Sequence, residues 1–166
     1  MSIINKRQSI RIFNEKEVEN EKIKSILESA MAAPSSKNKQ PWQFIILDNK
    51  EIINDFSNAH NNWKVLKSAN KVIIVCLDLN CDEREKHGLM ACSASTQNIL
   101  LKCEELNLGS VWLGLYPDDI RLNYTIEKLN IPNNIIPISL VAIGYYDNVK
   151  KRERKFDTNK IHFNQW

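Results

Sequence analysis

The sequence predicts one layered domain in which helices pack on a β-sheet, of the α/β or α+β class. Its 166 residues, 43% apolar and 26% charged, have the balance of a single globular domain. Roughly four strand-like apolar runs alternate with about five helical patterns, and no linker, repeat or low-complexity tract interrupts them. These features exclude wholesale disorder, a collagen-like fibre and a membrane bundle, so we expect one domain over residues 1–166.

Periodicity and breaking residues place the elements of the first half. Ser2 is a candidate cap for a short first helix. Apolar residues then repeat at helical spacing from Ile23 to Met31, with Asn20 as the candidate N-cap and Pro34 as the stop. Three further segments have the patterns of a strand, a short helix and a buried β-branched strand, in that order: 42–47, 52–58 and 71–77.

The second half opens with the longest helical pattern, residues 84–107. Gly109 is expected to end this helix by supplying a left-handed cap. Pro117 can occupy the first turn of another helix, which continues to about Leu129. Two apolar runs predict strands on either side of it: 110–115 and 137–145.

The tail, residues 147–166, is charged and has no clear period, yet it ends in apolar and aromatic side chains. These are Ile161, His162, Phe163 and Trp166. An exposed tail is rarely aromatic. We therefore expect the tail to pack, either on its own domain or on a partner chain.

Charge and residue usage exclude several classes of function. The net charge of +3 does not argue for nucleic-acid binding, and no run reaches the ~18 apolar residues of a membrane span, so we expect a cytoplasmic protein. No cysteine forms a C-x-x-C pair, which favours free, mostly buried thiols at Cys76, Cys81, Cys92 and Cys103.

The usual groups for hydrolysis and for nucleotide binding are missing from the sequence. The three histidines are far apart, which argues against acyl transfer and metal hydrolysis, and we expect no metal site. The four glycines form neither a G-x-G-x-x-G turn nor a P-loop. The chemistry is therefore expected to come from a cofactor, held without a glycine-rich phosphate cradle.

Three segments are polar where a plain domain needs no polar residue. Residues 7–11 (RQSIR) offer arginine and serine donors to a phosphate, although they could equally be a solvated basic helix end. Residues 33–42 (APSSKNKQPW) form a polar loop between two prolines, suited to the edge of a heteroaromatic ring or serving as an ordinary turn. Residues 108–114 (LGSVWLG) form a strand whose final glycine admits a flat ligand, or simply a buried strand.

Taken together, these segments resemble the FMN-dependent nitroreductase family. R-x-S-x-R-x-F, A-P-S-S-x-N-x-Q-P-W, Q-N-I-L-L, G-S-V-W-L-G and a basic tail ending in I-H-F-x-x-W follow in order from Arg7 to Trp166. The resemblance implies an α+β, three-layer αβα fold with a mixed central sheet flanked by helices. It also implies a homodimer with FMN at the subunit interface and a C-terminal extension that wraps the partner subunit.

The resemblance assigns the FMN-binding residues in four groups. The phosphate and ribityl group contains Arg7, Gln8, Ser9 and Arg11, with Arg152 and Arg154 closing on the phosphate. The loop contributed by the other subunit contains Ser35, Ser36 and Asn38, supported by Gln40. The ring lies against Trp112, Leu113 and Gly114, and its pyrimidine edge is held by Asn61 and Lys64.

The resemblance implies an NAD(P)H-dependent oxidoreductase. A hydride from NADH or NADPH would pass through flavin N5 to a nitroaromatic, a quinone or a similar small acceptor, in ping-pong order at one shared site and without a protein acid or base. Residues 79–87 leave little room for the long helical insertion of larger members. Two alternatives are a flavin-destroying or dehalogenating relative and a non-catalytic flavin-binding, storage or regulatory dimer.

Overall fold

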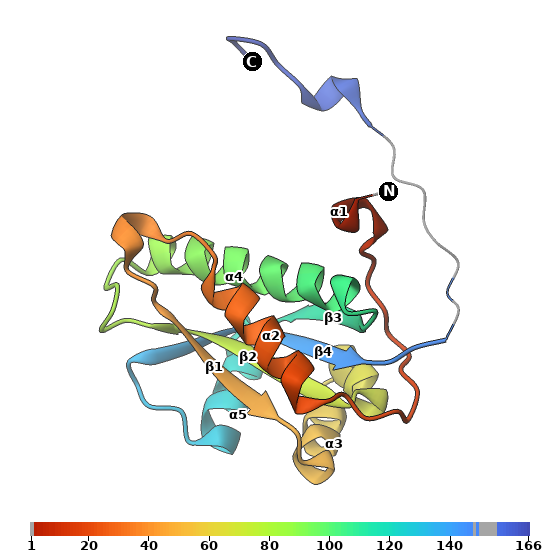
Figure 1. The fold of residues 1–166 in the computed structure, drawn as a ribbon. Coiled ribbons are helices and arrows are strands. Elements are labelled where there is room, and N and C mark those ends of the chain that lie inside the picture. Colours follow the sequence, from red (N-terminus) through yellow and green to blue (C-terminus); the bar gives the residue numbers. More distant parts are fainter. Residues whose placement is uncertain (1, 148, 150–155) are drawn as a thin grey trace.

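The computed structural model describes residues 2–147, 149 and 156–166, in which helices cover both faces of a four-stranded sheet (Figure 1). The strands are β1 (Trp42–Leu47), β2 (Lys71–Asp78), β3 (Gly109–Gly114) and β4 (Ile135–Gly144). The helices are α1 (Ile3–Lys6), α2 (Asn20–Met31), α3 (Lys50–Ala59), α4 (Glu85–Glu105) and α5 (Asp119–Leu129), with 3-10 helices η1 (Ser36–Asn38), η2 (Asn61–Ser68) and η3 (Thr158–Lys160). The α+β class and the three layers are thus confirmed.

The strands are arranged in the order β1-β2-β4-β3, and each neighbouring pair is antiparallel. The sheet was expected to be mixed; within the described residues, parallel pairing is confined to one isolated bridge between Ser9 and Ser110. A helix between two strands in the sequence is compatible with parallel or antiparallel pairing of those strands. The alternation of helices and strands therefore could not predict the strand directions. β1 and β3 form the two opposite edges.

The strand β2, one of the two inner strands, separates two apolar cores. Its odd-numbered residues, such as Ile73 and Val75, belong to the core under α2 and α4, and its even-numbered residues, such as Val72 and Ile74, belong to the core under α3, η2 and α5. Side chains of a strand alternate between the faces, so a strand buried on both sides is apolar throughout. Figure 1 shows these helix layers on either side of the sheet.

The helix α4 ends differently from the expectation. Asn107, with φ of 57°, takes the left-handed position, while Gly109 has no positive φ and is already part of β3. The Leu108 N–H donates to the Cys103 carbonyl at 2.8 Å and the Asn107 N–H to that of Glu104 at 3.2 Å, which is a Schellman cap. Asparagine tolerates this conformation nearly as well as glycine, so the stop moves two residues earlier.

Two further helix starts are corrected. The helix α2 begins at Asn20 itself, so Glu19 occupies the N-cap position. Pro117 lies outside α5, after a cis Tyr116–Pro117 peptide bond, and Asp118 is the N-cap, its side chain accepting from the Arg121 N–H at 3.0 Å. The Asp118 side chain satisfies a free N–H group of the first turn, so the helix begins directly after Asp118 and Pro117 precedes the cap.

The cysteines are free, as expected, and three of them are buried. Burial raises the pKa of the thiols of Cys76, Cys92 and Cys103 to about 12. The thiolate is the reactive form of cysteine, so these three side chains serve as small core residues rather than as nucleophiles.

The end of the tail, residues 156–166, is exposed along its whole length (Figure 1). Phe163 is 85% and Trp166 101% exposed. The contacts of this segment are local, such as the stacking of His162 on Trp166 with ring centroids 4.2 Å apart. Of the two alternatives expected for the tail, packing on its own domain is not found for these described residues, and packing on a partner chain stays a prediction.

Candidate functional site

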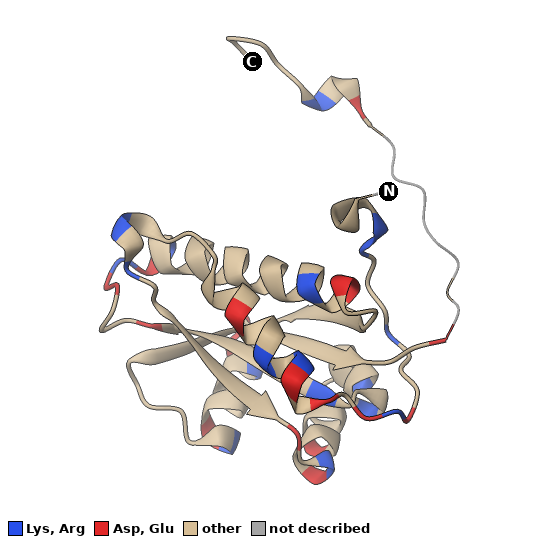
Figure 2. Ribbon diagram, in the orientation of Figure 1, with Lys and Arg blue, Asp and Glu red and all other residues tan. Residues whose placement is uncertain are grey.

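The residues predicted to bind a phosphate lie beside the start of β3. The Ile10 N–H donates to the Ser110 carbonyl at 3.0 Å, and Ser9 forms the parallel bridge with the same residue. The Arg7 and Gln8 side chains are half-buried, whereas Ser9 and Arg11 are exposed. The N-terminal arm therefore brings its serine and two arginines to one end of an edge strand, where Figure 2 shows the positive charges along the arm.

The outer edge of β3 presents peptide groups to its surroundings. The Ser110 carbonyl accepts from Ile10, and the Gly114 carbonyl accepts from Arg121, so both point away from β4. Peptide groups alternate in direction along a strand, so those of Trp112 point outward as well. Among the described residues, no hydrogen bond from outside the sheet occupies the Trp112 peptide groups.

The far end of β3 is open. A Cβ placed on Gly114 would meet no atom within 4 Å, and Gly114 is exposed. Trp112 is 36% exposed and Leu113 is half-buried. The backbone at Gly114 is therefore open enough for a flat ligand, and ring binding by Trp112, Leu113 and Gly114 stays a prediction.

Arg121 and Asp118, which the sequence analysis did not single out, fix this open end. Arg121 Nη1 donates to the Gly114 carbonyl at 2.7 Å, and its Nη2 donates to Asp118 Oδ2 at 3.0 Å. The hydrogen bonds from Arg121 lower the pKa of Asp118, so this carboxylate stays charged. The D-x-x-R spacing after Pro117 is a visible signal for the ion pair, but nothing in it indicates Gly114.

Asn61 and Lys64 are exposed on η2, which extends from the N-terminal arm to α5. At its far end the Ser68 hydroxyl accepts from the Phe13 N–H at 3.3 Å, and in its middle Trp63 packs on Tyr124 of α5 with ring centroids 5.9 Å apart. The two residues predicted to hold the pyrimidine edge thus lie on an element that contacts both the N-terminal arm and α5.

The loop predicted to cover the ring lies elsewhere. The Gln40 N–H donates to Ser35 Oγ at 2.9 Å, Gln40 Nε2 donates to Asn38 Oδ1 at 3.0 Å, and the Arg84 guanidinium donates to Ser36 Oγ at 3.3 Å. This loop leads into β1 and lies at the start of α4, whereas Ser9 lies beyond the end of α4.

The two predicted halves of the site do not meet within one chain. β1 and β3 are three strand spacings apart, about 14 Å. Along the axis of α4, its 21 residues, about 30 Å, separate the loop from the N-terminal arm but not from the ring end. Arg84 contacts Ser36 and lines the same pocket as Tyr116, so the loop and Gly114 lie at the same end of the sheet, on opposite edge strands. The structure therefore places the arm against both β3 and η2 and leaves Ser35, Ser36, Asn38 and Gln40 beside the opposite edge strand.

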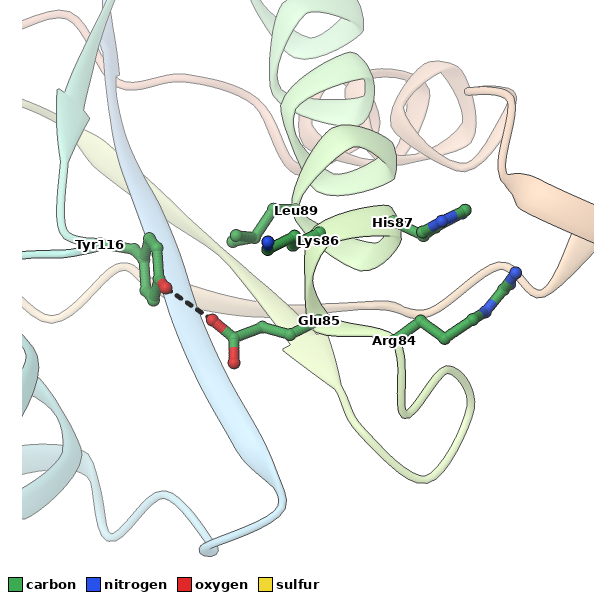
Figure 3. A pocket seen from close by; sticks show the side chains of 6 residues that line it. All are labelled: Arg84, Glu85, Lys86, His87, Leu89 and Tyr116. Atoms are coloured by element: carbon green, nitrogen blue, oxygen red, sulfur yellow. Dashed lines mark hydrogen bonds between the residues drawn. The ribbon is translucent and has the colours of Figure 1, made fainter.

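A pocket of about 550 Å³ adjoins the open end of β3. Its six lining residues are shown in Figure 3: Arg84, Glu85, Lys86, His87, Leu89 and Tyr116. The Tyr116 hydroxyl donates to Glu85 Oε1 at 2.5 Å, and this bond raises the pKa of Tyr116, which remains a neutral phenol. Arg84 is paired with Asp82 at 2.8 Å, so its charge is largely compensated inside the protein.

Three predictions remain: the two tail arginines, the absence of a metal site and the absence of a membrane span. Arg152 and Arg154 lie outside the described residues. Within residues 2–147, 149 and 156–166, no group of three or more histidine, cysteine or acidic side chains could hold a metal ion. No helix in that part of the chain is long and apolar enough to cross a membrane.

The residues that are present suit FMN. The nucleotide carries a phosphate at one end and a planar ring at the other, and the edge of β3 offers arginine and serine donors at Ser110 and an open glycine at Gly114. Charge-assisted contacts from arginine are the strong ones for a phosphate when no glycine-rich loop is present. A planar ring needs free space against the backbone, and the space over Gly114, which a Cβ would fill, provides it.

Comparison with known proteins gives the same result. Residues 4–64 and 56–145 match the Nitroreductase family. The chain is 36% identical over 170 residues to an Archaeoglobus fulgidus protein with the provisional name NADH dehydrogenase/NAD(P)H nitroreductase, covering 100% of this chain and 98% of that one.

Solved structures agree in both fold and sequence. A Clostridium acetobutylicum protein provisionally named an NADH oxidase has a TM-score of 0.95 and 37% identity, covering 99% of this chain and 100% of that chain. The FMN-dependent nitroreductase of Clostridium difficile R20291 has a TM-score of 0.91 and 31% identity, covering 99% of each chain. The chain described here belongs to the Nitroreductase family.

Proposed function

We propose that this chain is an FMN-dependent NAD(P)H oxidoreductase that acts as a homodimer on a nitroaromatic, a quinone or a similar small acceptor. The observation that carries the proposal is the edge of β3, where the arm of residues 7–11 meets Ser110 and the open Gly114 lies four residues further on. Four residues of strand span about 13 Å, which suits a ligand with a phosphate at one end and a ring at the other. The names of similar proteins, an NAD(P)H nitroreductase and an FMN-dependent nitroreductase, support it.

The side chains divide the work along this edge. Arg7, Ser9 and Arg11 bind the phosphate, and Arg152 and Arg154 are proposed to close on it from the tail. Trp112, Leu113 and Gly114 orient the ring, while Asn61 and Lys64 hold its pyrimidine edge. Two-electron transfer from NAD(P)H to the acceptor is the chemistry that FMN supplies when bound.

A second copy of the chain completes the site in this proposal. The loop of Ser35, Ser36, Asn38 and Gln40 is at the wrong edge to serve its own β3, so we assign it to the β3 of the partner subunit. The helix α4 supports this assignment because residues 88–101 carry no charged side chain, as Figure 2 shows, and yet Met90 is 63% exposed. A helix without charge on its outer face is usually covered.

The tail has a place in the same dimer. Its exposed aromatic residues, Phe163 and Trp166, need apolar surface that their own domain does not give them. We assign that surface to the partner subunit.

The visible spectrum of the purified protein tests the proposal first. Bound flavin is expected, and its absorbance should bleach on anaerobic mixing with NADH or NADPH at a catalytic rate. Steady-state rates with a quinone should give parallel double-reciprocal lines, because both substrates use one site in turn. A colourless protein that takes up no added FMN would refute the proposal.

Bound flavin that neither nucleotide bleaches would instead indicate a storage or regulatory dimer. Arg7→Ala separates the phosphate assignment from the fold: we expect the variant to lose FMN on desalting but to remain a dimer. Unchanged flavin content would contradict the role of the arm. A monomer that binds FMN stoichiometrically would contradict the loop assignment.

A further inference from the structure

We infer that Arg121 is a positioning residue for the ring end of the proposed flavin site, acting through the peptide of Gly114. The inference rests on the proposed function, since it concerns how that site is held. Arg121 lies on the first turn of α5, on a different element from every described residue assigned above.

The guanidinium of Arg121 is itself held in place. Asp118 accepts from the Arg121 backbone N–H at 3.0 Å through Oδ1 and from its Nη2 at 3.0 Å through Oδ2. One aspartate thus caps α5 and fixes the arginine side chain in a single direction. The remaining Nη1 points at Gly114, whose carbonyl it contacts at 2.7 Å.

Gly114 needs such support because the sheet stops holding it there. It is the last residue of an edge strand, and beyond it the N–H groups of Leu115 and Tyr116 both donate to the single carbonyl of Ile138, at 3.1 and 3.2 Å. The regular ladder therefore ends at Gly114. The Gly114 carbonyl and the Leu115 N–H belong to one peptide, whose N–H is held by Ile138 and whose carbonyl is held by Arg121. A glycine has more backbone freedom than any other residue, so a contact at each end of this peptide restricts it most.

The two peptides that flank the Gly114 Cα are held by different partners. The N–H and C=O of one strand residue point to the same side, so the Gly114 N–H also faces the free edge where the ring is proposed to lie. The Gly114 N–H belongs to the peptide of Leu113, which the ladder with β4 holds, while Arg121 holds the peptide on the carbonyl side. The glycine backbone against which the ring is proposed to lie is therefore fixed on both sides. The phosphate end, four residues away at Ser110, does not depend on Arg121.

The test compares FMN with riboflavin, which has the same ring and no phosphate. Titration of the apoprotein followed by flavin fluorescence gives the two dissociation constants. We expect Arg121→Gln to weaken both ligands by the same factor of about tenfold, because it removes a charge-assisted hydrogen bond at the ring end. Arg7→Gln should weaken FMN by at least tenfold and riboflavin by less than twofold.

Two further variants separate positioning from simple stabilisation of α5. Lys128→Gln removes the ion pair between Lys128 and Asp55, 2.6 Å apart, on the same helix and should leave both affinities within twofold. Arg121→Lys keeps one donor for the Gly114 carbonyl and should recover most of the affinity. The visible circular dichroism of saturating FMN should change in Arg121→Gln and remain as in the parent in Lys128→Gln.

The outcomes are distinct. A parent protein that binds neither flavin would overturn the proposed function and this inference together. A parent that binds both, with Arg121→Gln within twofold of it, would overturn the inference and leave the function standing. Equal losses in Arg121→Gln and Lys128→Gln would assign Arg121 to helix docking alone, and a loss confined to FMN would move it to the phosphate end.

Discussion

The two glycines that bound β3 lie in opposite surroundings. A Cβ on Gly109 would come within 2.8 Å of side-chain carbons of Ile10 and Tyr146, whereas a Cβ on Gly114 would meet nothing within 4 Å. Neither residue has a positive φ, so backbone conformation requires glycine at neither position. Gly109 is thus small because protein fills its space, and Gly114, on our proposal, because a ligand does. On this proposal, one strand carries a glycine needed for packing at one end and a glycine needed for binding at the other.

The largest expected effect is on stability, at the closed end. Gly109→Ala forces Ile10 and Tyr146 apart and should lower the free energy of unfolding by about 1–3 kcal/mol, as measured by urea denaturation of the apoprotein. The loss should persist with saturating FMN. A variant as stable as the parent would show that the N-terminal arm yields easily and that this end is not closed.

The next effect is on binding, at the open end. Gly114→Ala introduces a methyl group into the space proposed for the ring and should weaken FMN about tenfold, which is about 1.4 kcal/mol. The apoprotein should unfold at an equal or higher urea concentration, because alanine costs less conformational entropy than glycine in a strand. Unchanged FMN affinity with unchanged stability would contradict the proposal that the flavin ring lies at this end of β3.

A smaller effect should come from the charge on η2. Lys64→Gln removes an exposed cation from the proposed pyrimidine edge, which is worth about 1 kcal/mol in water at contact distance. We expect the midpoint potential of bound FMN to fall by about 20 mV, because the positive charge favours the more negative reduced ring. Lys67→Gln, an exposed cation on the same 3-10 helix, is the matched control. An equal fall in both variants would reduce the effect to net charge.

The smallest expected effect is the pH dependence of the stability that the ion pair between Arg121 and Asp118 contributes at the open end. Arg121 holds the pKa of Asp118 below its ordinary value, so the pair stabilises the fold fully above the usual aspartate pKa of about 3.9. That stability is lost as the pH falls through the lowered pKa. The difference in unfolding free energy between the parent and Asp118→Asn should therefore shrink between pH 6 and pH 3. A constant difference across that range would show that the carboxylate charge contributes nothing.

Local patterns predicted much of the fold. The strand over 42–47 is confirmed residue by residue, and the buried strand that starts at Lys71 gains a single residue, Asp78. The helix stop at Asn107 was assigned to Gly109 because a glycine near a helix end is the stronger local signal, although asparagine can take the same conformation. The directions of the strands depend on long-range pairing, which periodicity does not encode.

The site was predictable only where one segment carries its own chemistry. Arg7, Ser9 and Arg11 are close in the sequence, and the structure joins their segment to β3 at Ser110; their role at a phosphate stays a prediction. Arg121 became visible only when the fold brought it to Gly114, seven residues away on another element. The location of the 35–40 loop at the far edge of the sheet depends on strand order, and its proposed partner is in another molecule.

The outer edge of β3 also bears on whether the chain without FMN aggregates. A bare strand edge is a template for pairing with other strands, and proteins commonly block such edges. Here the N-terminal arm blocks one end at Ser110 and Arg121 caps the other at Gly114, leaving a gap about as long as the ligand proposed to fill it. If FMN binds along this edge as proposed, the apoprotein should aggregate faster than the FMN-saturated protein.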